Sequence, residues 1–265
     1  TINVNGAHVS SLPSHGVVAI SSPSRKITDE DRARVEEAAT VINLPANREI
    51  IQVFAKNYKI DGQDNIKDPV GMQGVRLEVD TVVVTAGIPL LRNLDSAIEK
   101  AQVAVHNHTV SSLAAAEAVL DRKQKESGVA VIDIGAGTTN IVVIEEGEVE
   151  YVSVIPIGSQ NLTNDLAIGL KTDLDIAEAV KKAHASLDDT IEPPEEVSVE
   201  HGGKRHSFSE KTVRMVVEAR VDELLEQIER EFKKISKSRK LPGGVVIVGG
   251  MANMPGIAEY FKDAL

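Results

Sequence analysis

The sequence predicts an α/β protein with two lobes, in which a small α+β unit precedes a larger core of strands and helices. Its 265 residues are enough for roughly two domains of ~100–150 residues. Over residues 103–265, short apolar segments alternate with segments of helical spacing, as in α/β domains. Earlier in the chain, Leu77 and Val79 alternate with Arg76, Glu78 and Asp80, which is typical of a half-buried strand.

Composition excludes several classes of protein. The chain has 42% hydrophobic and 26% charged residues, as soluble globular proteins do, and without cysteine it cannot form disulfides or a cysteine metal site. A net charge of −11 and only 3% aromatic residues argue against a nucleic-acid partner. No apolar run reaches the ~18–20 residues that span a bilayer, and no signal-peptide pattern is present. Because the chain starts on Thr1 in a strand-like pattern and ends on Leu265 in a helical one, we expect both ends to be cut.

The first part of the chain has its own succession of elements. Thr28 is a favourable N-cap, and the acidic residues that follow it suit the positive end of a helix dipole. Pro45 ends that helix. We expect strands over 17–20, 49–58 and 75–84, and helices over 28–41 and 90–101.

The second part alternates strands and helices. We expect strands over 103–110, 129–134, 141–144, 149–156 and 244–248, and helices over 111–123, 158–170, 173–185 and 209–234, with another from Pro255. Residues 188–204, which include Pro193 and Pro194, are polar and are expected to be a surface excursion.

The most informative segment follows the apolar strand 129–134. That strand delivers Asp133 to its tip, and glycines and hydroxyl residues follow. Glycine permits close approach of backbone to a ligand, and successive N–H groups in such a turn can bind an anion. Asp133 is placed to hold Mg²⁺ through water. The alternative is a hairpin turn capped by Asp133. The candidate phosphate-binding residues are Asp133, Gly135, Ala136, Gly137, Thr138 and Thr139.

Two further features fit a nucleotide site. Gly249 and Gly250 follow the strand 244–248, and paired glycines there expose backbone to a flat ligand at the carboxyl edge of the sheet. Glu178 and Lys181 are three residues apart on one helix face, where they could bond a ribose or an adenine edge. The alternatives are an ordinary strand-to-helix turn and a solvated surface ion pair.

In this order the segments resemble the superfamily of actin, sugar kinases and chaperone ATPases. Residues 133–139 look like its second phosphate loop, Gly249-Gly250 with Gly256 like its adenosine loop, and 113–120 like its connecting helix. Segments 15–20, 67–79 and 163–170 resemble the FtsA family within it, and the likeness covers nearly the whole chain.

The resemblance implies a two-lobed actin-like (ribonuclease H-like) fold with an FtsA-specific SHS2-type subdomain. It implies an SHS2-type subdomain over 1–103 and a remnant of the first lobe with the connecting helix over 104–128. A nucleotide-binding second-lobe core over 129–168 and 241–265 and an upper subdomain over 169–240 complete the division.

The resemblance also implies a function. ATP and Mg²⁺ would bind between the lobes with little or no turnover, and the chain would assemble into actin-like filaments. It would link the FtsZ ring, through the FtsZ C-terminal tail, to the cytoplasmic membrane at the division site, beside other divisome proteins. Arg220 lies in the region that resembles the FtsZ-tail surface, and Glu117 lies near where the superfamily orients water. For these two the alternatives are solvated helix faces.

The chain departs from the family pattern in three ways. The first phosphate loop would precede residue 1, the C-terminal amphipathic membrane helix would follow residue 265, and Asn140 stands where the family usually has Asp. Two rival functions remain, a pilus assembly scaffold similar to PilM and an active ATPase or kinase of the same superfamily. A fragment without autonomous activity is a third.

Overall fold

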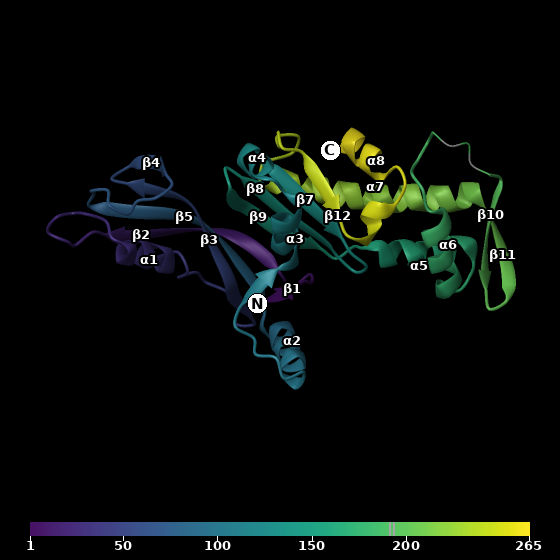
Figure 1. Ribbon diagram of the computed structural model, residues 1–265, viewed down its shortest axis with the longest axis horizontal. Coiled ribbons are helices and arrows are strands. Elements are labelled where there is room, and N and C mark those ends of the chain that lie inside the picture. The colour runs from purple at the N-terminus through teal and green to yellow at the C-terminus, as the bar shows by residue number, and fades with distance from the viewer. Residues whose placement is uncertain (191, 193) are drawn as a thin grey trace. The chain divides into compact units, whose positions relative to one another are not determined.

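The computed structural model describes residues 1–190, 192 and 194–265, with Asp263 described by its backbone alone (Figure 1). Its internal contacts divide the chain into two compact units. The first unit comprises residues 1–130, 141–154 and 242–244, and the second comprises 131–140, 155–241 and 245–265. Each unit has its own buried core and is described separately below.

A four-stranded antiparallel sheet organises the start of the first unit. Its order is β2 (Ser10–Ala19), β5 (Arg76–Gly87), β3 (Arg48–Ile60) and β4 (Gln63–Ile66). Helix α1 (Asp29–Ala38) covers one face, where Leu77, Val79 and Val35 are fully buried. Gly16 of β2 permits this packing, because a Cβ atom there would lie 2.1 Å from the Val35 carbonyl oxygen. The alternation predicted for β5 is confirmed.

The start of α1 follows the predicted cap. The Thr28 hydroxyl accepts from the Asp31 backbone N–H at 3.3 Å, and the Thr28 N–H donates to the Asp31 carboxylate at 3.0 Å. These reciprocal bonds form a capping box, which satisfies donors that a helix start otherwise leaves unpaired. Hydrogen bonding from Thr28 lowers the pKa of Asp31, although burial of the carboxyl opposes this.

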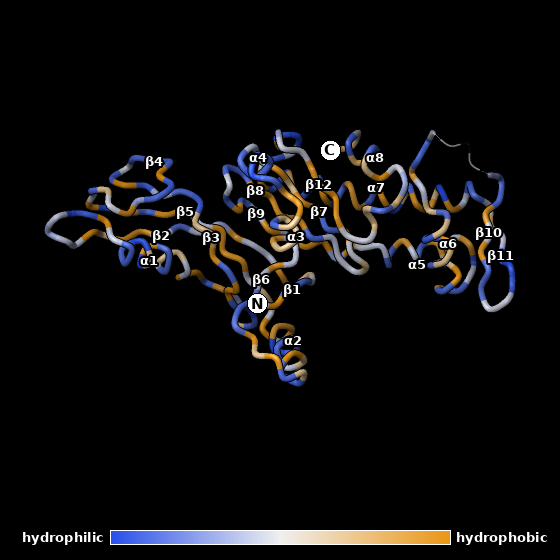
Figure 2. The backbone as a smooth tube through the Cα atoms, in the orientation of Figure 1, coloured by the Kyte–Doolittle hydropathy of each residue, from blue (hydrophilic) through white to orange (hydrophobic). Residues whose placement is uncertain are grey.

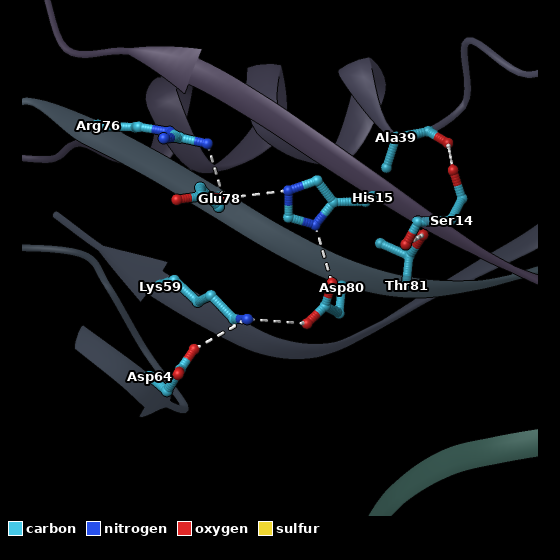
Figure 3. A network of polar contacts seen from close by, with 9 residues as sticks. All are labelled: Ser14, His15, Ala39, Lys59, Asp64, Arg76, Glu78, Asp80 and Thr81. Atoms are coloured by element: carbon cyan, nitrogen blue, oxygen red, sulfur yellow. Dashed lines mark hydrogen bonds and ion pairs between the residues drawn. The ribbon is translucent and has the colours of Figure 1, made fainter. Parts of the chain in front are cut away.

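The opposite face of this sheet carries a ladder of charges (Figure 3). His15 of β2 contacts Asp80 through Nδ1 at 2.8 Å and Glu78 through Nε2 at 3.1 Å. Lys59 of β3 continues the ladder from Asp80 to Asp64 of β4, and Arg76 contacts Glu78. The side chains of His15 and Asp80 are 43% and 45% exposed, so solvent screens their attraction. This face is therefore a polar surface, and the α1 face supplies most of the stability.

The rest of the first unit contains a short parallel pair and three helices. Strand β1 (Ile2–Val4) pairs with β6 (His108–Val110), and α2 (Ile88–Lys100) and α3 (Ser111–Val119) flank β6 in sequence. The helix predicted over 111–123 is interrupted, because Leu120 has extended backbone angles and Asp121 caps a separate helix, α4 (Arg122–Ser127). The strand predicted over 103–110 is limited to β6.

A second four-stranded sheet has strands with residues of both units. Its order is β12 (Val245–Val248), β7 (Val129–Ile134), β8 (Thr139–Glu145) and β9 (Glu148–Ile155). Strands β7 and β8 are almost wholly buried, and their apolar character is visible in Figure 2. These strands lie close to where the sequence predicts them.

Helices build most of the second unit. They are α5 (Ser159–Leu170), α6 (Leu174–His184), α7 (Glu210–Lys234), the 3₁₀ helix η1 (Gly250–Asn253) and α8 (Ile257–Ala264), and α5 packs against both α6 and α7. In the part of the chain that the structure describes, no helix is both long and apolar enough to cross a membrane.

The polar segment 188–204, predicted to be a surface excursion, includes the first strand and the turn of a hairpin that the sequence analysis did not predict. Strand β10 (Glu196–His201) pairs antiparallel with β11 (Lys204–Ser209), while Pro193 lies outside the described residues. The turn is Gly202-Gly203, and both glycines have positive φ, as a type I′ hairpin turn requires. The glycine pair was a usable hairpin signal, but the polar residues of β11 concealed its strand.

The two faces of β2 predict contrasting effects of neighbouring substitutions. Gly16→Ala should lower the free energy of unfolding by about 1–3 kcal/mol, because its methyl group overlaps the α1 backbone. His15→Ala should cost less than about 1 kcal/mol, and less still in concentrated salt. Chemical denaturation of both variants measures this, and equal losses would contradict the assignment of the core to the α1 face.

Candidate functional site: a glycine-lined loop and cavity

The loop between β7 and β8 is a tight turn with an exposed crest. The Gly135 N–H donates to the Thr138 carbonyl oxygen at 2.9 Å, and Ala136 and Gly137 are exposed. Nothing lies within 4 Å of the place where a Gly137 side chain would be. A ligand can therefore approach the backbone of this loop closely.

The N-terminus of α5 holds this loop from below. The Ser159 N–H donates to the Gly135 carbonyl at 2.9 Å, and the Gln160 N–H donates to the Ala136 carbonyl at 2.8 Å. The approach requires Gly158, since a Cβ there would lie 2.5 Å from the Ala136 oxygen. Sequence reasoning missed Gly158, and only its position just before a helix hinted at a role.

Asp133 lies at the tip of β7, against a second glycine. A Cβ atom on Gly249 would lie 2.6 Å from an Asp133 carboxylate oxygen, and Gly249 has φ +87°, which favours glycine. The Asn140 side-chain amide of β8 donates to the other Asp133 oxygen at 3.3 Å. The Thr139 hydroxyl donates instead to the Ile157 carbonyl at 2.8 Å, so this predicted phosphate ligand is engaged within the protein.

A cavity of about 310 Å³ lies in the second unit, a size that suits a small ligand. It brings together the predicted residues Glu178, Lys181 and Gly250. Its lining also includes residues that the sequence analysis did not single out, among them Ser159, Leu162, Met251 and Pro255. Glycine at 250 leaves open space, because nothing lies within 4 Å of a Cβ built there.

Glu178 and Lys181 form a partly buried network with Thr163, rather than a solvated surface pair. Lys181 Nζ lies 2.6 Å from Glu178 Oε2 and donates to the Thr163 hydroxyl at 2.8 Å. The Lys181 side chain is only 12% exposed. Burial would raise the pKa of Glu178, but hydrogen bonds from Lys181, Thr163 and Lys182 outweigh it and hold that pKa below its ordinary value.

Glu117 belongs to the first unit, whereas the other candidate site residues belong to the second. It lies on α3 in the first unit, its side chain is 76% exposed, and it pairs with Lys125 Nζ at 2.9 Å. No geometry of the first unit by itself marks it as catalytic. Among the described residues, no three His, Asp or Glu side chains are arranged to hold a metal ion.

Arg220 lies beside a groove of about 450 Å³ between α5 and α7. Its guanidinium contacts Asp165 of α5 and, at 2.6 Å, Glu223 of α7. Hydrogen bonding to Asp165 raises the pKa of Arg220, so the guanidinium stays charged. The groove also exposes Ile168 and Met215, which are 76% and 61% accessible. Arg220 thus joins two helices and also borders an apolar surface.

The Glu178 network predicts a pH-dependent stability difference. Because the folded pKa of Glu178 is lowered, its contribution is present above the ordinary value of 4.5 and is lost as pH falls through the lowered value. Glu178→Gln should reduce the free energy of unfolding by about 1–2 kcal/mol near neutral pH, with a smaller difference in acid. Denaturant titrations at several pH values test this, with Glu226→Gln as the control because Glu226 lies on α7 outside this network and is 70% exposed.

Comparison with known proteins adds an independent observation. A family model described as "SHS2 domain inserted in FTSA" matches residues 6–85, and one described as "Cell division protein FtsA" matches residues 130–265. The cell division protein FtsA of Bacillus subtilis (strain 168) is 39% identical over 100% of this chain and 60% of its own length. FtsA of Pseudomonas aeruginosa is 34% identical over 99% of this chain and 63% of its own length. The chain therefore spans about three fifths of these relatives.

Solved structures show the fold. The PilM–PilN type IV pilus biogenesis complex matches 97% of this chain and 64% of its own chain, with a TM-score of 0.61 and 17% identity. MreB5 of Spiroplasma citri bound to ADP matches 66% of this chain and 57% of its own, with a TM-score of 0.55 and 19% identity. The fold is therefore actin-like α/β with an SHS2 domain. With a family model matching over half of its length, the chain belongs to the FtsA family of cell division proteins.

Proposed function

We propose that this chain is the central part of a cell division adaptor that binds Mg-ATP, assembles into actin-like filaments and docks the C-terminal tail of FtsZ. A C-terminal amphipathic helix outside these residues would attach the protein to the cytoplasmic face of the membrane at the division site. Other divisome proteins would bind there too. The observation that carries the proposal is the pair of close backbone approaches at Gly158 and Gly249, which frame the Asp133 loop.

The residues of the second unit fit a nucleotide. The crest at Gly137 is open for phosphate oxygens, and the cavity beside Glu178 and Lys181 has the size and mixed lining of a small-ligand site. The MreB5 structure of the same fold was obtained with ADP, which supports the choice of ligand class.

Each residue has a proposed role toward the nucleotide. The backbone N–H groups of 136–138 and the Thr138 hydroxyl would bind phosphate, while the Gly135 N–H, which donates to the Thr138 carbonyl, would keep the turn closed. Gly249 and Gly250 would lie along the adenosine. Glu178 and Lys181 would bond the ribose or adenine edge. Asp133 would hold Mg²⁺ through water, and Mg²⁺ would screen the phosphate charges.

ATP acts in this proposal as a conformational ligand. Its contacts would favour one arrangement of the protein that assembles head to tail, with turnover slow or absent. Glu117 would contribute at most to weak hydrolysis.

We propose the division into an SHS2-type subdomain (1–103), a first-lobe remnant (104–128), a second-lobe core (129–168 and 241–265) and an upper subdomain (169–240).

The α5–α7 groove is the proposed docking site for the FtsZ tail. Ile168 and Met215 offer apolar surface, and Arg220 offers a positive charge at its edge. An extended peptide with apolar side chains and a carboxylate would fit this combination. The PilM-like scaffold is the second candidate, which the shared fold with the PilM–PilN complex favours.

Nucleotide binding should depend on Gly249. Gly249→Ala places a methyl group about 2.6 Å from the Asp133 carboxylate and should weaken binding of a fluorescent ATP analogue at least ~10-fold, or about 1.4 kcal/mol. Gly62→Ala is the matched control, because Gly62 also has a positive φ, +90°, and lies in the β3–β4 turn of the first unit with open space around it. Equal losses in both variants would attribute the effect to backbone strain and contradict the proposed role.

Docking of the tail should depend on the exposed apolar residues of the groove. Ile168→Ser and Met215→Ser should each weaken binding of a labelled FtsZ tail peptide about 5- to 10-fold in fluorescence anisotropy. Val41→Ser is the control, since Val41 is 85% exposed in the first unit.

To test the role of Arg220 in binding, a substitution is needed that disturbs the α5–α7 contact less than charge reversal does. Arg220→Glu would set a third carboxylate against Asp165 and Glu223 and so disturb the α5–α7 pairing, whereas Arg220→Lys keeps the charge. No binding by the folded parent would contradict the FtsZ-tail proposal and favour the PilM-like candidate.

A further inference from the structure

Asn140 has a buried side-chain amide of which only the NH₂ group, and not the oxygen, has a hydrogen-bond partner among the described residues. It is completely buried on β8, and its Nδ2 donates to Asp133 Oδ2 at 3.3 Å. Its Oδ1 accepts no hydrogen bond from the described residues. Buried polar atoms almost always have partners, so this amide oxygen, next to a candidate ligand carboxylate, is a place where water or a bound ligand would supply the missing donor.

The Asp133 carboxylate is positioned by neutral groups. Gly249 leaves room for one oxygen, and Asn140 donates to the other. Within the described residues, no lysine or arginine forms an ion pair with Asp133. Its orientation therefore depends on the Asn140 N–H, and its negative charge has no fixed partner.

An amide and a carboxylate at position 140 would have opposite consequences for cations. Two carboxylates at hydrogen-bond distance repel each other, and a cation between them relieves the repulsion. One carboxylate offers too few oxygens for Mg²⁺ or Mn²⁺, which need about six, so the remainder must come from water or from another ligand. Among the described residues, no three His, Asp or Glu side chains are grouped to hold a metal ion, which fits a site that needs oxygens from water or from another ligand.

We infer that Asn140 is a positioning residue that orients Asp133 and keeps it a lone carboxylate, so that the chain takes up a divalent cation only together with a nucleotide. This inference rests on the proposed nucleotide function. The phosphates would supply the oxygens that the protein lacks. A carboxylate at position 140 would instead create a cation site that needs no nucleotide.

Mn²⁺ titration without nucleotide tests the inference, with free Mn²⁺ followed by electron paramagnetic resonance. The parent should bind Mn²⁺ only weakly, whereas Asn140→Asp should bind it at least ~10-fold more tightly and gain thermal stability with Mn²⁺. Asn161→Asp is the matched control, because an Asp there can still accept the hydrogen bond from the Gly158 N–H. It should behave as the parent does.

A charge swap isolates the pairing. The double variant Asp133→Asn with Asn140→Asp again has one amide and one carboxylate, so it should lose the gain in Mn²⁺ affinity. Tight Mn²⁺ binding by the parent, or an Asn140→Asp variant no tighter than Asn161→Asp, would overturn the inference. Tight Mn²⁺ binding by the parent would overturn the inference even if a variant failed to fold. Failure of the parent to bind nucleotide would count against the proposed function, whereas the Mn²⁺ comparison of the parent with Asn140→Asp tests the role of Asn140 separately.

Discussion

Two places where backbone meets backbone determine the geometry of the candidate site. At Gly158 the start of α5 approaches the carbonyls of Gly135 and Ala136, and at Gly249 the turn after β12 approaches Ile134 and Asp133. A methyl group at either position would overlap atoms 2.5–2.6 Å away. Because all of these contacts except that with the Asp133 carboxylate are formed by backbone, the shape of the loop depends little on side-chain rotamers. The crest at Gly137 can therefore stay exposed without losing its conformation.

Polar groups in the second unit connect its helices and also border its cavities. Lys181 and Glu178 neutralise each other where burial would penalise either charge alone, and Thr163 accepts from one and donates to the other. The same side chains line the cavity beside α6. Arg220 likewise connects α5 to α7 through Asp165 while bordering the exposed groove. In both cases the fold already holds in place the group that borders the cavity or groove, so a ligand that bound there would cost less entropy of ordering.

The SHS2 sheet separates its two roles by face. Its α1 face is apolar and closely packed, and its other face carries polar and charged side chains from all four strands (Figure 3). Exposed ion pairs contribute little to stability, so that face can change in sequence with small cost.

The sequence by itself located many of the regular elements and the residue types at the tip of β7, but it did not locate β4, β10 or β11. Periodicity located β5, β7 and α7, and the Thr28 cap and the Asp133 loop followed from local residue types. The family resemblance predicted the actin-like fold with its SHS2 domain, and the comparisons confirm both.

Only the tertiary structure decided which of these groups are occupied by the protein itself. In the folded chain the Thr139 hydroxyl bonds the Ile157 carbonyl, and Arg220 pairs with Asp165, 55 positions away in the sequence. The fold also requires glycine at position 158, because a side chain there would overlap the Ala136 carbonyl. Local pattern cannot specify such partners, because hydrogen bonds and steric overlap depend on segments that folding brings together from distant parts of the chain.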